Sequence, residues 1–222
     1  MTHLAFINPL LFSPGDRLSR EEFLALWEQM PSMKFAELID GTVYMPSPLS
    51  LAHGGRDGQV QLLFGTYAAR TRVCELATNA TWLLLESAPQ PDAALWLLPQ
   101  YGGGITVVNE LASGAPELIA EICHSSRSYD LGPKLSLYQR AGVPEYIAFL
   151  IKERRVEWRI LEEGSYRVQK PDPQGILRSR IFPGLWLDES AYWRGDSAGM
   201  LEVLDQGLRS EEHAEFLRRL GA

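Results

Sequence analysis

Two acidic residues of this chain sit in apolar, strand-like surroundings. Asp92 comes directly before the stretch 93–98, and Glu121 interrupts the apolar run 118–123. Burying an ionised carboxylate without a cation or hydrogen-bond donors is costly, so two of them on adjacent short strands indicate a shared cation. Lys134 follows on the next expected helix. The order Asp, Glu, Lys is typical of a metal-dependent phosphodiesterase site.

This chemistry has definite requirements. Hydrolysis of a phosphodiester needs an activated water, a Lewis acid for the charge that develops on the phosphate, and help for the leaving oxygen. Carboxylates that hold one or two Mg²⁺ ions with open positions supply most of these needs. Asp92 and Glu121 are far enough apart in the chain to lie on different, neighbouring strands. The ammonium group of Lys134 could then orient the water and stabilise the charged phosphate.

Each of these residues also has a structural interpretation. Asp92 follows Pro91, and a Pro-Asp pair often simply starts a strand or closes a turn. Lys134 could form an i,i+4 ion pair with Asp130, which is the commoner role for a lysine at this spacing. Glu121 favours function, because an acidic residue among five apolar ones is seldom there for solvation.

Glu37 and two histidines are further candidates. Glu37 shares its strand face with Phe35 and Ile39, so it could reach the same interior, but the residues alone slightly favour an exposed hairpin carboxylate. His53 and His124 each lack a second histidine three or four positions away. For both, a helix-cap or core histidine is therefore favoured over a metal ligand.

The elements that must position these residues alternate between strands and helices. Ser19 and Glu22 form a capping box that predicts a helix start, and Asp40-Gly41 predicts a tight hairpin. Asp130 is expected as the N-cap of a helix with Pro133 in its first turn. Strands are predicted over 34–39, 42–45, 73–77, 80–85, 92–98, 118–123, 145–151, 156–161 and 166–169, with a small edge at 185–187, and helices over 52–70, 131–141 and 200–220, the last interrupted near Gln206-Gly207.

This order predicts an α/β fold with one mixed sheet flanked by helices and an amphipathic C-terminal helical tail. We expect an N-terminal extension over 1–18, the folded domain over 19–190 and the tail over 191–222. The tail is expected to pack on the domain or on a second subunit.

The composition is that of a soluble globular protein, with 45% hydrophobic and 22% charged residues in a chain of 222. Cys74 and Cys123 are far apart, so neither a disulfide scaffold nor a zinc ribbon is indicated, and a reducing cytoplasm fits best. The opening segment lacks the features of an export signal, and the apolar runs are too short to span a membrane. The net charge of −7 counts against an extended basic surface for nucleic acid, although most arginines lie in the second half.

Several strings of residues resemble the Uma-two (Uma2) family of putative restriction endonucleases. The resemblance covers residues 20–190 or so and rests on specific motifs. These are ELIDG at 37–41, His53, PD at 91–92, PELIAEI at 116–122, YDLGPK at 129–134 and YQRAGVPEY at 138–146.

That family is assigned to the PD-(D/E)XK nuclease superfamily, so the resemblance implies a restriction-endonuclease-like fold and a Mg²⁺-dependent phosphodiesterase site. By position, Asp92 matches the PD aspartate, Glu121 the (D/E) glutamate, and Glu37 the early acidic residue that can complete the metal site. The superfamily lysine would stand at position 123, where this chain has Cys123. The family supplies its lysine from the following helix, which makes Lys134 the candidate.

The residues and the resemblance together predict a DNA endonuclease with Mg²⁺ or Mn²⁺ as its cofactor. In this prediction Asp92, Glu121 and Glu37 bind the metal, and Lys134 positions the attacking water. DNA is the expected partner, no membrane is involved, and a homodimer is expected because cutting both strands of a duplex needs two active sites. The alternative is a catalytically inactive nuclease-fold module that binds nucleic acid or a protein, which the acidic net charge and Cys123 favour.

Overall fold

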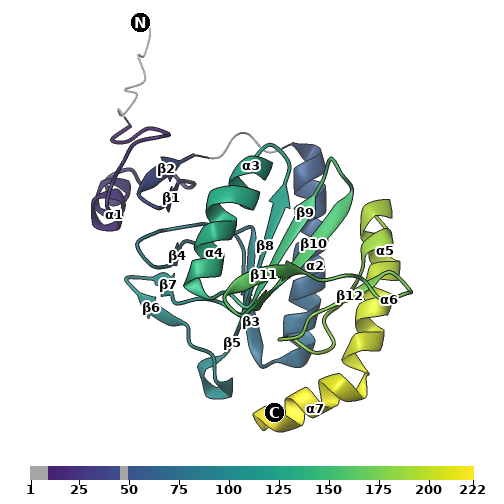
Figure 1. The fold of residues 1–222 in the computed structure, drawn as a ribbon. Helices are drawn as coiled ribbons and strands as arrows, with labels where there is room; N and C mark the ends of the chain where they lie inside the picture. Colours follow the sequence, from purple (N-terminus) through teal and green to yellow (C-terminus); the bar gives the residue numbers. More distant parts are fainter. Residues whose placement is uncertain (1–9, 46–49) are drawn as a thin grey trace, which may run out of the picture.

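A six-stranded mixed sheet forms the centre of the protein in the computed structural model, which describes residues 10–45 and 50–222 (Figure 1). The strand order is β11-β10-β9-β8-β5-β3, with β8 and β9 parallel and the other neighbours antiparallel. The strands are β3 (Cys74–Ala77), β5 (Ala93–Leu97), β8 (Leu118–Cys123), β9 (Glu145–Leu150), β10 (Arg155–Glu162) and β11 (Ser165–Val168). The predicted α/β fold with a mixed central sheet is confirmed. Residues 1–9 of the expected N-terminal extension lie outside the described residues.

A helical crossover joins the parallel strands β8 and β9, as parallel pairing requires. It consists of α3 (Arg127–Tyr129), the π-helical turn η2 (Asp130–Lys134) and α4 (Leu135–Ala141). The prediction of Asp130 as N-cap was wrong, because its backbone N–H donates to Ser126 O at 2.9 Å inside a helix that has already begun. Pro133 has no N–H and would clash in a regular α-helical interior, and the wider π turn accommodates it.

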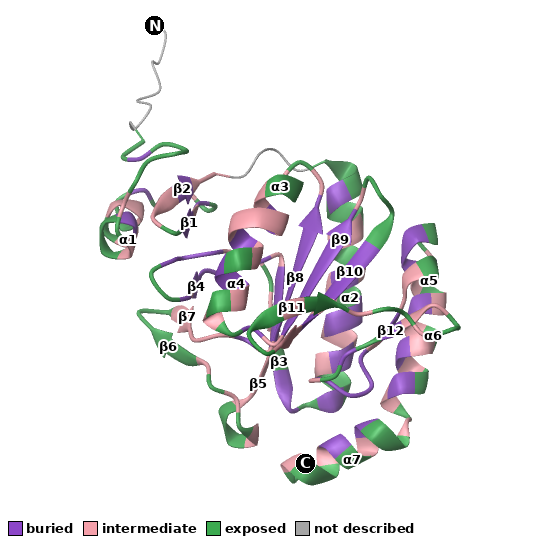
Figure 2. Ribbon diagram, viewed as in Figure 1, coloured by how far each residue is buried: buried purple, intermediate pink, exposed green. Residues whose placement is uncertain are grey.

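Helices cover both faces of the sheet (Figure 1). On one face, α2 (Leu51–Thr71) contributes Val60 and Phe64 to a core that includes Leu118, Ala120 and Ile122 of β8. On the other face, α4 contributes Leu137 and Tyr138 to a second core, with Ile119 and Cys123. Strand β8 is buried along its whole length, as the purple strand in the middle of Figure 2 shows. Glu121 therefore lies on the same face of β8 as α4, since strand residues alternate between faces.

The N-terminal lobe has a small core of its own, with Phe23, Leu38 and Val43 among its members. It consists of α1 (Arg20–Glu28) and the hairpin of β1 (Glu37–Ile39) and β2 (Thr42–Tyr44). The predicted capping box is present at the start of α1. The hairpin turn has φ values of 49° at Asp40 and 75° at Gly41, as a type I′ turn requires. Backbone hydrogen bonds between Leu38 and Ala88 hold the hairpin against the segment that leads to β5.

The remaining strands form two small sheets. One contains β4 (Trp82–Leu83), β7 (Leu111–Ser113) and β6 (Thr106–Val108), beside the short 3₁₀ helix η1 (Pro99–Tyr101). The strand predicted over 80–85 is thus reduced to two residues, and the backbone turns at Leu85, whose φ is 51°. The other sheet pairs β12 (Ile176–Arg178) with β13 (Trp186–Asp188).

The C-terminal helices pack on the domain of their own chain. They are α5 (Glu189–Arg194), α6 (Ser197–Leu208) and α7 (Glu211–Leu220), and Met200, Leu204 and Phe216 join the core that α2 covers. The break between α6 and α7 falls just after Leu208, near the predicted Gln206-Gly207. Gly207 is the last but one residue of α6, and its lack of a side chain allows a close backbone approach, since a Cβ there would lie 2.2 Å from Gly184 O. Within the described ranges, no helix is both long and apolar enough to cross a membrane.

A buried carboxylate ties β9 to the segment after β12. Glu145 is fully buried, and its two oxygens accept hydrogen bonds from Trp158 Nε1, Ser179 Oγ and the backbone N–H groups of Arg180 and Ile181, at 2.6–3.1 Å. Four donors satisfy most of the acceptor capacity of an ionised carboxylate. This carboxylate therefore has a structural role.

We expect Glu145→Ala to lower the free energy of unfolding by about 3 kcal/mol, because four donors lose their acceptor and two of them, Trp158 Nε1 and Ser179 Oγ, are buried. Urea denaturation measures this change. Glu162→Ala is the matched control, since Glu162 is 36% exposed and forms ion pairs with Arg167 and Arg180 at the surface. The control should change stability by less than about 1 kcal/mol. Equal losses in the two variants would contradict the structural role of Glu145.

Candidate active site

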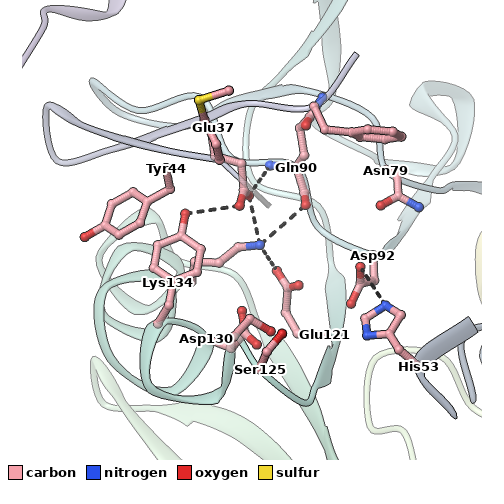
Figure 3. A pocket seen from close by; sticks show the side chains of 14 residues that line it. Glu37, Tyr44, His53, Asn79, Gln90, Asp92, Glu121, Ser125, Asp130 and Lys134 are labelled. Carbon is pink, nitrogen blue, oxygen red and sulfur yellow. Dashed lines mark hydrogen bonds and ion pairs between the residues drawn. The ribbon is translucent and has the colours of Figure 1, made fainter. Parts of the chain in front are cut away.

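A cavity of about 640 Å³ lies between the N-terminal lobe, the central sheet and the helical crossover (Figure 3). Its charged side chains include Glu37 of β1, Asp92 ahead of β5, Glu121 of β8 and Lys134 of η2. The structure thus brings the four predicted site residues to one cavity. Its volume is that of a typical small-ligand site, roughly 300–1,000 Å³.

The register of β5 and β8 brings Asp92, just ahead of β5, next to Glu121 of β8. Ala93 pairs with Ala120 in the antiparallel register of β5 and β8, so the next position places Asp92 opposite Glu121. Opposite residues of an antiparallel pair point to the same face. Asp92 Oδ2 also accepts a hydrogen bond of 2.6 Å from the backbone N–H of Ile122, which fixes this carboxylate against β8.

Lys134 forms ion pairs with two carboxylates at once. Its Nζ lies 2.9 Å from Glu37 Oε1 and 2.7 Å from Glu121 Oε1, and it donates to Gln90 O at 3.4 Å. The partners are therefore Glu37 and Glu121, and the i,i+4 partner expected from the sequence, Asp130, is not the residue it contacts. Burial alone would lower the pKa of Lys134, but Glu121 and Glu37 outweigh this effect and raise that pKa well above its usual value. The lysine stays protonated.

The packing of β8 explains why the lysine comes from the crossover and not from position 123 of the strand itself. Cys123 lies on the same face as Glu121 and is 1% exposed among apolar residues such as Ile119 and Leu137. The crossover helix passes over that face, so a side chain from η2 can reach Glu121. Tyr138, one turn after Lys134, donates a hydrogen bond to the same carboxylate at 2.8 Å.

Glu37 points into the cavity, where the resemblance placed it, so the slight preference that the residues alone gave for an exposed hairpin carboxylate was wrong. Its side chain is 13% exposed. One oxygen, Oε1, accepts from the backbone N–H of Gln90 at 2.6 Å and lies beside Lys134, and the other accepts from Tyr129 OH at 3.1 Å. Hairpin geometry alone leaves either direction open, and the docking of the lobe on the residues before β5 selects the inward one.

His53 reaches the cavity from the first turn of α2. Its backbone N–H donates to Ser50 Oγ, which caps the helix, and its Nε2 lies 3.9 Å from Asp92 Oδ1. Burial lowers the pKa of His53, with Asp57 opposing the change, so the ring is neutral at pH 7. Sequence spacing favoured a cap or core histidine, and the contact with Asp92 depends on where α2 packs.

Tyr138 and Gln90 are among the residues of the site that were missed in the sequence. Tyr138 lies four positions after Lys134, and this i,i+4 spacing was a usable signal for a shared helix face. Gln90 contributes its backbone N–H to Glu37 and its backbone oxygen to Lys134, and such contacts leave no trace in residue type.

Carboxylates outnumber cations among the side chains that line the cavity. Glu37, Asp92, Glu121 and Asp130 face it together with the single lysine, Lys134. Burial raises the pKa of Asp92 from 3.8 to about 7, and Lys134 opposes this rise only in part. Burial also raises the pKa of Glu121, against the lowering effect of Lys134. A further cation would remove the cost of ionising these carboxylates.

The donor set fits a hard divalent cation. Mg²⁺ is commonly held by one or two carboxylates, with substrate phosphates and waters as its other ligands, and Asp92 and Glu121 offer such a pair. Across residues 10–45 and 50–222, no three His, Cys, Asp or Glu side chains are grouped so as to hold an ion by themselves. The residues therefore fit a metal site in which the substrate phosphate and waters supply the remaining ligands. A ligand role for Glu37 stays a prediction, because both of its oxygens already accept hydrogen bonds.

Comparison with known proteins finds a family model and a solved structure that are similar to this chain. The model of the Uma2 family, described as "Putative restriction endonuclease", matches residues 20–190. Among solved structures, a putative nuclease of the DUF820 group from Anabaena variabilis ATCC 29413 has 15% sequence identity and a TM-score of 0.63. The match covers 80% of this chain and 98% of that one, and at this identity it supports the fold. No curated protein matches the chain significantly.

The raised pKa of Asp92 makes stability depend on pH. Because its folded value of about 7 exceeds the ordinary 3.8, this group favours folding below about pH 4, and that contribution is lost as pH rises to 7. Asp92→Asn cannot ionise, so without divalent cations the variant should be about as stable as wild type at pH 4. It should become more stable by about 2–4 kcal/mol at pH 8.

Urea denaturation at pH 4, 6 and 8 with a chelator measures this difference. Glu75→Gln is the control, because it removes an exposed carboxylate on β3 and leaves the cavity unchanged, and it should not reproduce the gain in stability of Asp92→Asn at pH 8. Parallel pH profiles for wild type and Asp92→Asn would rule out an uncompensated charge at Asp92.

Proposed function

Because the chain belongs to the Uma2 family of putative restriction endonucleases, we propose that it is a metal-dependent endonuclease that hydrolyses phosphodiester bonds of DNA. The observation that carries the proposal is the cavity in which Lys134 contacts Glu37 and Glu121 while Asp92 lies beside them with a raised pKa. Perturbed carboxylates and a fixed cation in one cavity are typical of a catalytic site.

The two sheet carboxylates would hold the metal. Asp92 and Glu121 are the residues that would bind Mg²⁺ or Mn²⁺. A bound ion of this kind polarises the phosphate and promotes ionisation of a water. Asp92 is fixed for this role by its hydrogen bond with the backbone of Ile122, and Glu121 by its hydrogen bond with Tyr138. Two oriented carboxylates on rigid strands set the position of the substrate phosphate.

Lys134 acts as a fixed positive charge and hydrogen-bond donor. Its raised pKa keeps it protonated, so it cannot serve as the general base. An ammonium held near the phosphate stabilises the negative charge that builds up in the transition state and can orient the attacking water. Glu37 holds that ammonium from the opposite side, so Glu37 positions Lys134 whether or not it also contacts the metal.

A second candidate function is a nuclease-fold module without catalysis. The specific observation in its favour is that Lys134 occupies the space between Glu37 and Glu121, where an ion would otherwise bridge them. In that case the cavity would bind nucleic acid or a protein without cutting. The two functions differ in whether the protein binds Mg²⁺.

A homodimer is part of the endonuclease proposal, because two sites are needed to cut both strands of a duplex. The C-terminal helices pack on the domain of their own chain through residues such as Leu204 and Phe216. Light scattering at micromolar concentration should give about twice the mass of the chain. A monomeric mass would limit the enzyme to cutting one strand at a time.

Cleavage of supercoiled plasmid tests the activity. Wild type with Mg²⁺ should nick the DNA, and Asp92→Ala or Glu121→Ala should lower the rate by about 100-fold or more, because losing a metal ligand removes several kcal/mol of transition-state stabilisation. Glu75→Ala, which removes an exposed carboxylate on β3, should cut at the wild-type rate. Equal nicking by all four proteins would show that the activity is a contaminant and refute the proposal.

Thermal unfolding separates the enzyme from the inactive module. Mg²⁺ at 100 times its dissociation constant should stabilise the wild type by about 2.7 kcal/mol and leave Asp92→Ala unchanged. A protein that binds DNA but shows no Mg²⁺ shift and no cleavage would be the module.

A further inference from the structure

The cavity has an apolar side that metal-assisted hydrolysis does not require. Phe35, Tyr44 and Met45 line it from the N-terminal lobe, and Tyr129 lines it from the crossover helix. The rings of Tyr44 and Tyr129 stack with their centroids 4.1 Å apart and their planes at 28°. The carboxylates and Lys134 suffice for phosphate chemistry. The aromatic surface is therefore suited to contact a part of the ligand other than the phosphate.

Phe35 is the exposed member of this surface. Its side chain is 49% exposed, although the residues after it, Ala36 and Glu37, turn inward. A single exposed phenylalanine is unremarkable on an outer surface, but this one borders a cavity with buried charges. Aromatic faces in such a position bind nucleobases by stacking, and the interaction tolerates any base because every base has a π face.

The depth of the charged residues limits which DNA can reach them. The side chains of Glu121 and Lys134 are each 3% exposed, and that of Asp92 is 18% exposed. A stacked duplex keeps its bases inside, so it could bring a phosphate to the mouth of the cavity but could not place a base within it. A nucleotide outside the stack brings both, and proteins that act on such nucleotides hold the base between aromatic or apolar side chains.

A polar side chain beside Asp92 suits the edge of such a base. Asn79 lines the same cavity and carries an amide that can donate and accept hydrogen bonds (Figure 3). Its backbone has a φ of 50°, and its N–H donates to Pro91 O at 3.1 Å, which holds it next to the Asp92 segment. Unpaired bases are read at their hydrogen-bonding edges by groups of this type.

We propose that the cavity binds one unpaired nucleotide of a DNA strand, with its base against Phe35 and its phosphate toward Lys134 and Asp92. This inference rests on the proposed nuclease function and specifies its substrate as DNA that is single-stranded or locally unpaired. The apolar side of the cavity, from Phe35 to the Tyr44–Tyr129 pair, then holds the base, and the polar side holds the phosphate.

The test compares one DNA sequence as a single strand, a blunt duplex and a duplex with a three-nucleotide gap. With Mg²⁺, the single strand and the gapped duplex should be cut at least about ten times faster than the blunt duplex. Binding is measured by fluorescence anisotropy with Ca²⁺ in place of Mg²⁺. Phe35→Ala should weaken single-strand binding by about 5-fold or more, the lower end of base–aromatic stacking. Phe35→Trp should retain it.

Val107→Ala is the matched control, because Val107 is a 74% exposed apolar residue on β6 that does not line the cavity, and it should bind as wild type does. Equal cleavage of all three DNAs would overturn the inference and leave the nuclease intact. If the single strand is cut faster and Phe35→Ala shows the same preference as wild type, the proposed site for the base would also be overturned. Phe35-dependent binding of single strands without any cleavage would refute the nuclease and support the binding site.

Discussion

The ammonium group of Lys134 lies between the carboxylates of Glu37 and Glu121, and this ion-pair cluster joins three separate parts of the fold. Glu37 comes from the N-terminal hairpin, Glu121 from the central strand β8, and Lys134 from the crossover that follows it. A buried charge of either sign is strongly unfavourable alone, so each part needs the other two in place. The cluster therefore couples the docking of the lobe to the folding of the sheet.

The backbone conformation of the crossover places Lys134 and Tyr138 where both can contact Glu121. A regular α-helix cannot hold Pro133 in its interior, and the chain uses a π-helical turn that ends at Lys134. The wider turn changes the angular position of the residues that follow it on the helix. Tyr138 and Lys134 both contact Glu121 from this segment. Short π-helical turns inside helices often occur at functional sites, and here the turn carries a lysine that lines the cavity.

Glu145 and Asp92 are carboxylates of low exposure that have different surroundings. Burial raises the pKa of Glu145 as well, but an indole, a hydroxyl and two backbone N–H groups donate to this carboxylate and oppose the rise without a metal or a cation. Asp92 has a backbone donor and a neutral histidine near it, and burial raises its pKa to about 7. The first arrangement holds segments together. In the second arrangement, ionising Asp92 costs free energy that a bound cation would reduce.

Residue type and order were enough to predict the mixed sheet, the hairpin at Asp40-Gly41, the capping box of α1 and the two acidic positions on adjacent strands. These features depend on local periodicity, turn chemistry and the cost of burying a charge, all of which are properties of short segments. The direction of Glu37, the contact of His53 with Asp92 and the backbone contacts of Gln90 depend on how distant segments pack. The partners of Lys134 belong to the same class, since an i,i+4 rule describes one helix and its actual partners lie on two strands. Local sequence thus indicated that Asp92 and Glu121 need compensation, and only the tertiary structure decided which groups provide it, because charges are paired across space and not along the chain.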